Sequence, residues 1–92
     1  MKKKVIKVSA TTNVKKLAAS ISYLIEEQNS QNIELRAIGA SSVNQMYKAV
    51  AILRSMVAIK GRDIFIKPGF HTIPDEKNER LVTAMVAYLD IR

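Results

Sequence analysis

The chain has 92 residues, of which 48% are apolar and 25% are charged, a composition typical of one folded domain. It contains no cysteine, which excludes disulfide bonds and thiolate metal sites. No apolar run approaches the ~20 residues of a membrane-spanning helix, and no apolar segment of about 7–15 residues follows the lysine-rich start as in a signal peptide. We therefore expect one cytoplasmic domain over residues 1–92, with residues 1–4 as a flexible basic tail.

The positive charge is concentrated in two segments of the chain. Residues 1–16 contain six lysines and no acid, and residues 41–62 contain four basic residues and no acid. The remaining residues sum to −3, within a formal net charge of +7. Two basic segments on a near-neutral body indicate an anionic partner, most simply nucleic acid. The alternative is that these lysines serve only solubility.

The first third of the chain predicts a strand and a helix. Residues 4–10 alternate and are rich in β-branched side chains, which predicts a strand with Ile6 and Val8 on its buried face. Thr11 or Thr12 is expected to cap the helix that follows. Apolar residues then recur at i, i+3, i+4 and i+7 between positions 14 and 25, the pattern of a helix with one buried face.

A second strand and a long central helix follow. Residues 33–40 predict a strand that ends sharply at Gly39. Ser42 and Gln45 match the S-x-x-Q capping box, so we expect a helix over residues 43–58.

The central helix is apolar around most of its circumference, whereas a helix packed on one sheet needs a stripe only a little over ~100° wide. The excess predicts a second partner, either another part of this chain or another copy of it. Arg54 lies inside the apolar arc, where it either extends to water along its stem or meets a carboxylate or phosphate at an interface. The residues expected at an oligomer interface are Tyr47, Val50, Arg54, Val57, Val86 and Tyr88.

The last third predicts two more strands. Residues 63–67 form the third, and the prolines and glycine within residues 68–78 predict a loop. Residues 81–91 form the last strand, with apolar side chains on both faces, which predicts that helices or a partner cover both. Phe65, Phe70 and the tyrosines do not cluster in the sequence as a stacking platform for bases, and each is expected in the core.

The predicted order is therefore βαβαββ, an α+β domain with two helices on a mixed four-stranded sheet. Right-handed strand–helix–strand units make the first two strands parallel and place both helix starts at one sheet edge. Free amides, hydroxyls and lysines at such an edge suit phosphate binding. This predicts contacts from Thr11, Thr12, Lys15, Lys16, Ser41, Ser42 and Lys48. For any one of the serines and threonines, capping the helix is a simpler explanation than phosphate binding.

Nothing in the sequence indicates catalysis. His71 is the only histidine and stands apart from any cysteine, serine elbow or acidic pair. The carboxylates of residues 26–27 and 75–76 are adjacent in the chain and are expected to be solvated. Neither a phosphate-binding P-loop nor a G-x-G-x-x-G segment occurs. We expect a non-enzymatic protein with no cofactor and no metal.

Three segments resemble the stage V sporulation protein S family: VIKVSATTNVKKLAASI, LRAIGASSVNQMYKAVAILRSMV and IFIKPGFHTI. The similarity extends over residues 5–89. It implies an Alba-like fold, dimerisation, nucleic-acid binding and a regulatory role in sporulation, notably in septation and coat assembly. On this resemblance Asn44, Gln45 and Lys48 match the family's N-Q-x-x-K motif, and Gly39 matches its tight turn. Asn44 and Gln45 thereby join the predicted nucleic-acid contacts.

The sequence departs from Alba proteins at two places. Where these have a basic segment between the first strand and first helix, this chain has Thr11 and Thr12, with Lys15 and Lys16 a turn later. Where they have a long basic hairpin arm, residues 68–78 contain one lysine against two acids.

Three functions remain open at this point. The first is a dimer or higher homo-oligomer that binds the DNA or RNA backbone without sequence preference. The second is a protein–protein adaptor of sporulation whose central helix and last strand form the oligomer interface. The third is a small phosphate or nucleotide ligand at the helix-start edge.

Overall fold

The computed structural model describes residues 3–92 as a four-stranded sheet with two helices. The elements are β1 (Lys4–Val8), α1 (Val14–Glu26), β2 (Ile33–Ala37), α2 (Ala40–Ala58), β3 (Ile64–Asp75) and β4 (Arg80–Ile91). The strand order in the sheet is β1-β2-β4-β3, with β1 and β2 parallel and the other two pairs antiparallel. The predicted βαβαββ order, the mixed sheet and the α+β class are therefore confirmed.

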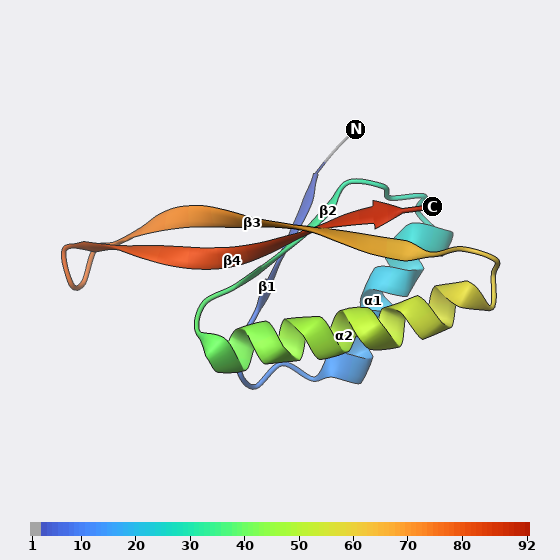
Figure 1. Cartoon of the computed structure of the whole chain (residues 1–92), viewed down its shortest axis with the longest axis horizontal. Coiled ribbons are helices and arrows are strands. Elements are labelled where there is room, and N and C mark those ends of the chain that lie inside the picture. Colours follow the sequence, from blue (N-terminus) through green and yellow to red (C-terminus); the bar gives the residue numbers. More distant parts are fainter. Residues whose placement is uncertain (1–2) are drawn as a thin grey trace.

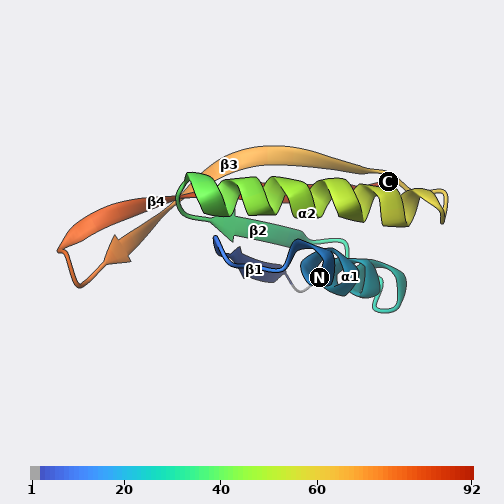
Figure 2. The same cartoon turned by 90° about the horizontal axis from the view of Figure 1, so that it is seen from below.

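Both helices pack on one face of the sheet and cross each other there (Figures 1 and 2). Ile21 and Ile25 of α1 and Leu53 and Val57 of α2 are at most 1% exposed. They meet alternate residues of all four strands, because successive side chains of a strand point to opposite faces. The strand residues on this helix-covered face are Ile6, Val8, Ile33, Leu35, Ala37, Ile64, Ile66, Met85, Ala87, Leu89 and Ile91.

Within residues 3–92 no helix covers the second face, so of the two predicted ways of covering the last strand on both sides, by helices or by a partner, the structure rules out helices of this chain. At its centre Glu34 is 1% exposed. The Lys3 Nζ lies 2.7 Å from its Oε1, and Arg36 Nε donates to its Oε2. Burial alone raises the pKa of Glu34, but hydrogen bonds from Lys3 and Arg36 outweigh it and lower the pKa below the usual 4.5.

The predicted tail over residues 1–4 overlaps this ion-pair cluster. Lys4 is the first residue of β1, and Lys3 is held by Glu34, so neither belongs to a free tail. Met1 and Lys2 lie outside the described residues.

The predicted loop over residues 68–78 is wrong. Strands β3 and β4 stay paired from Ile64↔Ile91 to Asp75↔Arg80, so they form a hairpin arm that extends beyond the helices (Figure 1). The arm contributes to a longest dimension of 46 Å. Pro68 and Pro74 indicated a loop, but β3 is an edge strand, where a missing N–H need not cost a ladder bond.

Both helix starts differ from the predicted caps. Asn13, not Thr11 or Thr12, caps α1, and its Oδ1 accepts from Lys16 N at 3.0 Å. Helix α2 begins at Ala40, directly after Gly39, whose φ of 89° suits glycine, and it has no side-chain cap. The capping box predicted at Ser42 and Gln45 is therefore absent, because both residues already lie inside the helix.

Strand lengths and aromatic positions also differ. Strand β1 ends at Val8 instead of position 10, and β2 ends at Ala37 instead of position 40. The placement of the aromatic side chains in the core is wrong. Those exposed by 40% or more are Tyr23, Tyr47, Phe65, Phe70 and Tyr88.

The Glu34 cluster predicts an acid-sensitive contribution to stability. Because its pKa in the folded protein lies below 4.5, the stabilisation is complete above the unfolded value and is lost as pH falls through the folded value. We expect Glu34→Gln to lower the free energy of unfolding by about 1–3 kcal/mol at pH 7, and to lose less stability than the parent protein on acidification. Urea unfolding between about pH 3 and pH 7 measures both. Parallel pH curves for the two proteins would contradict this role.

Candidate nucleic-acid interface

The loop before α1 and the start of α2 are joined by a hydrogen bond. Gln45 Nε2 donates to the carbonyl oxygen of Thr12 at 2.9 Å, across 33 positions of sequence. The two segments that the sequence predicted to meet at one sheet edge are therefore in contact here. The Gln45 side chain is committed to this link and is half-buried.

Hydroxyl groups in the loop before α1 bond mainly to one another. The Ser9 backbone N–H donates to Thr12 Oγ1 at 2.8 Å, and the Ser9 Oγ lies 3.2 Å from the hydroxyls of both Thr11 and Thr12. This network shapes the loop. Ser42 is only 8% exposed, so its hydroxyl is not at the surface.

Six of the nine predicted contact residues are exposed, whereas Thr12 and Gln45 are half-buried and Ser42 is buried. The exposed ones are Thr11, Lys15, Lys16, Ser41, Asn44 and Lys48. Lys15 and Lys16 lie in the first turn of α1, whereas Lys48 lies about two turns into α2. Neither helix has an acidic residue in its first turn, so no carboxylate offsets the positive end of either helix dipole. The geometry suits an anion.

Five of the six residues predicted at an oligomer interface divide into a buried and an exposed group, and the sixth is Arg54. Val50, Val57 and Val86 are at most 6% exposed, so their side chains are used within the chain. Tyr47 and Tyr88 are 70% and 40% exposed. Tyr47 lines a groove between α2 and edge strand β3, whose other residues are Val50, Ala51, Arg54, Ile64, Phe65 and Ile66.

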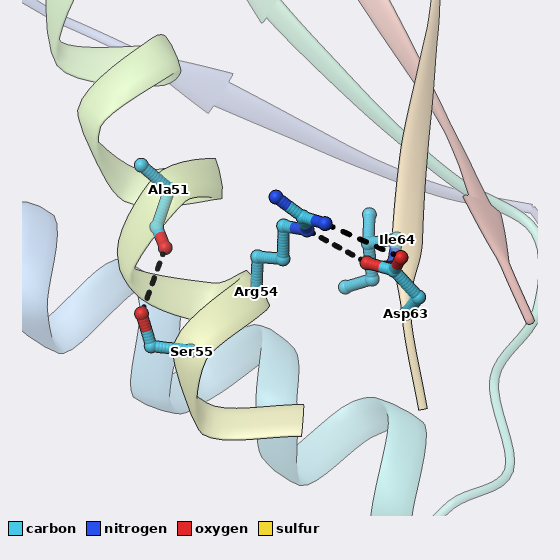
Figure 3. A network of polar contacts seen from close by, with 5 residues as sticks. All are labelled: Ala51, Arg54, Ser55, Asp63 and Ile64. Carbon is cyan, nitrogen blue, oxygen red and sulfur yellow. Dashed lines mark hydrogen bonds and ion pairs between the residues drawn. The ribbon is translucent and has the colours of Figure 1, made fainter. Parts of the chain in front are cut away.

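Arg54 pairs with a carboxylate of its own chain at the end of this groove (Figure 3). Its Nε lies 2.7 Å from Asp63 Oδ1 and its Nη2 lies 3.4 Å from Oδ2. The Arg54 hydrogen bond, together with one from the Ile64 N–H, lowers the pKa of Asp63 below its usual 3.8. Arg54 therefore joins α2 to the start of β3.

The described residues, 3–92, contain no group of three or more histidine, cysteine or acidic side chains that could hold a metal ion. His71 is exposed on the hairpin arm. No helix in this range is long and apolar enough to cross a membrane.

The sequence model of the family described as Stage V sporulation protein S (SpoVS) matches residues 4–91. The chain belongs to this family. Membership implies a role in sporulation. The fold is similar to that of a solved structure, "Alba from Thermoplasma volcanium", with a TM-score of 0.65 and 16% sequence identity. That match covers 94% of this chain and 98% of the Alba chain, so the two share the architecture over nearly their full lengths.

Sequence reasoning missed one feature of this SpoVS chain, the position of Phe65 and Tyr88. They lie on the same, helix-free face of neighbouring strands, because Phe65 pairs with Asp90 and Tyr88 lies two residues before Asp90. Alternation within each strand could have assigned the face. It could not give the register between β3 and β4, which decides that the two rings share one face.

The Gln45 bond predicts a structural role for a residue of the N-Q-x-x-K motif. We expect Gln45→Ala to lower the free energy of unfolding by about 1 kcal/mol, because the half-buried Thr12 region loses a hydrogen bond. Its neighbour Asn44 is exposed, and Asn44→Ala is the matched control with a change below about 0.5 kcal/mol. Urea unfolding followed by circular dichroism measures both. Equal effects of the two substitutions would contradict a structural role for the Gln45 bond.

Proposed function

We propose that this SpoVS-family chain is a non-enzymatic regulator of sporulation that binds the nucleic-acid backbone as a dimer. The observation that carries the proposal is the uncapped start of α2 at Gly39, in a helix that Gln45 links to the loop before α1, on whose first turn Lys15 and Lys16 are exposed. Free helix-start amides and lysines bind phosphates without reading bases. The binding is therefore largely independent of sequence.

The distribution of charge supports the helix-start edge over the hairpin arm as the phosphate-binding surface. Residues 68–83 contain three acids and two basic residues, a net charge of −1. In contrast, Lys15, Lys16 and Lys48 are exposed and have no acid within ion-pair distance among residues 3–92. The arm tip repels phosphate, and the edge attracts it.

Charge reversal tests the edge. We expect Lys15→Glu with Lys48→Glu to weaken binding of a labelled duplex by about 10-fold or more, because each lysine that neutralises a phosphate releases a counterion. The slope of log K against log salt should become shallower by about 2 for the double variant. Fluorescence anisotropy at several salt concentrations measures both quantities, for duplex DNA and duplex RNA.

The matched control makes the same change in charge at the far end of α2. Lys60→Glu with Arg62→Glu should leave the salt slope close to that of the parent protein. Equal losses in the two double variants would indicate that net charge alone, not this edge, attracts the nucleic acid. No binding by the parent protein at low salt would contradict the proposed function.

Dimerisation is proposed through the groove between α2 and β3, where the Tyr47 side chain is 70% exposed. We expect Tyr47→Asp to convert dimer to monomer in sedimentation experiments while the circular dichroism spectrum stays unchanged. Val50 is unsuitable for this test, because a charge at a 6%-exposed core position would unfold the chain. Tyr23→Asp makes the same change on α1, at a side chain that is 56% exposed, and should leave the dimer intact. A monomeric parent protein would contradict the proposal.

An adaptor function is the second candidate, and it is supported by the hairpin arm. Phe70 and Leu81 are 72% and 71% exposed, and alternation places both on one face of the arm. Exposed apolar side chains on a projecting element suit a protein partner. Under this function, cells that carry Phe70→Ser with Leu81→Ser would show the sporulation defect of cells that lack the protein. Cells that carry Lys15→Glu with Lys48→Glu would sporulate normally.

A further inference from the structure

The helix-free face of the sheet carries two exposed aromatic rings, one on each of two neighbouring strands. Phe65 on β3 is 49% exposed and Tyr88 on β4 is 40% exposed. Phe65 is registered with Asp90 and Tyr88 with Lys67, and the Tyr88 ring lies over Gly69, on the side of Lys67 away from Phe65. Two flat apolar surfaces are thus presented to solvent from rigid strands.

Gly69 gives the Tyr88 ring its position. A Cβ atom at Gly69 would lie only 2.8 Å from Tyr88 Cε2 and 3.6 Å from its Cζ. The ring therefore occupies the space that any other residue at position 69 would need. A glycine covered by a neighbouring aromatic ring is a known device of edge strands, and here it holds the ring close to the sheet.

Phe65 is flanked by a guanidinium. The Arg92 Cζ lies 4.8 Å from the centre of the Phe65 ring, and the Arg92 Nη2 is 2.9 Å from Asp90 Oδ2. The side chain of Arg92 is nevertheless 66% exposed. The guanidinium lies over one face of the phenyl ring, and an exposed guanidinium plane is itself a positively charged surface of the kind on which unpaired bases stack.

The same face has an excess of positive charge. Its cations are Lys3, Lys7, Arg36, Lys67 and Arg92, and its anions are Glu34 and Asp90. Glu34 is already paired with Lys3 and Arg36, and Asp90 with Arg92. Lys7 and Lys67 are exposed and have no acid within ion-pair distance among residues 3–92. They lie on opposite sides of Tyr88, on β1 and β3.

We infer that this face binds single-stranded nucleic acid, with bases stacked on Tyr88 and Phe65 and phosphates held by Lys7 and Lys67. In a duplex the bases are stacked on one another, so their planes are not free to stack on the two rings. A second copy of the chain would bring one face with a charge of +3 against another, which like-charge repulsion opposes. Only a partner with both anionic groups and planar apolar groups matches the two features together.

The inference rests on the proposed function only in taking nucleic acid as the ligand. The helix-start edge lies along the C-terminal ends of β1 and β2, whereas the rings lie on the open face of β3 and β4. The two surfaces use different residues and favour different strandedness, so each can fail without the other.

Leucine substitutions separate stacking from burial. We expect Tyr88→Leu and Phe65→Leu each to weaken binding of a labelled 12-nucleotide oligo(dT) or oligo(U) by about 5- to 100-fold in fluorescence anisotropy, since one base–aromatic stack is lost. Tyr88→Phe keeps the ring and should bind within about two-fold of the parent protein. Tyr23→Leu, an exposed tyrosine on α1, is the matched control and should have no effect. Circular dichroism melts check that each variant folds.

Duplex binding provides the second readout. Under the inference Tyr88→Leu and Phe65→Leu leave duplex affinity unchanged, and Lys15→Glu with Lys48→Glu weakens the duplex far more than the single strand. If the lysine variant loses both ligands and the leucine variants lose neither, single strands bind at the helix-start edge and the inference is wrong. If single strands bind through Tyr88 while duplexes do not bind at all, the inference stands and the proposed helix-start edge fails. If the parent protein binds neither ligand, both fail.

Discussion

The pairing of β2 between parallel β1 and antiparallel β4 is the constraint on which the rest of this structure depends. A parallel neighbour requires a crossover element, so α1 must lie on one face of the sheet. Helix α2 follows β2 directly after Gly39 and packs against α1 on the same face. Leu35, which is fully buried at the centre of β2, marks the middle of the single core that results.

One consequence of a single helical layer is that the sheet retains an open face. Burial there depends on side chains alone, and at its centre a buried carboxylate is stabilised by two cations instead of by apolar packing. The same openness leaves Phe65 and Tyr88 at the surface of rigid strands. A second consequence is the free edge of β3, which borders α2 and extends into the arm. The chain thus offers three surfaces of different chemistry: a basic edge, an apolar groove and a basic aromatic face.

Much of the architecture could be predicted from periodicity. The 3.6-residue spacing of Leu17, Ile21 and Ile25, and the alternation of Ile33, Leu35 and Ala37, assigned both types of element and their buried faces. Residue preference was less reliable at boundaries. Pro68 and Pro74 predicted a loop where an edge strand tolerates them, and Ser42 predicted a cap where Gly39 ends the strand without one. At the prolines, a local preference was outweighed by long-range pairing of the backbone.

In the candidate sites, too, features that depend on neighbours along the chain could be predicted, and features that depend on distant residues could not. The clustering of lysines could be seen in the sequence, because it depends only on which residues are close along the chain. The role of Gln45 was not, since its partner Thr12 is 33 positions away. Nor was the division of the predicted interface into buried Val57 and exposed Tyr47, because a helix wheel does not say which neighbour covers which side.

The sequence by itself determined the element types, their order, the core faces of α1, β1 and β2, and the excess of positive charge. Those properties follow from side chains within a few positions of one another. Only the tertiary structure decided that Phe65 and Tyr88 share one open face, that Glu34 is buried between two cations, and that the last two strands form an arm. These depend on the register between strands, and a shift of one residue would move every side chain to the other face.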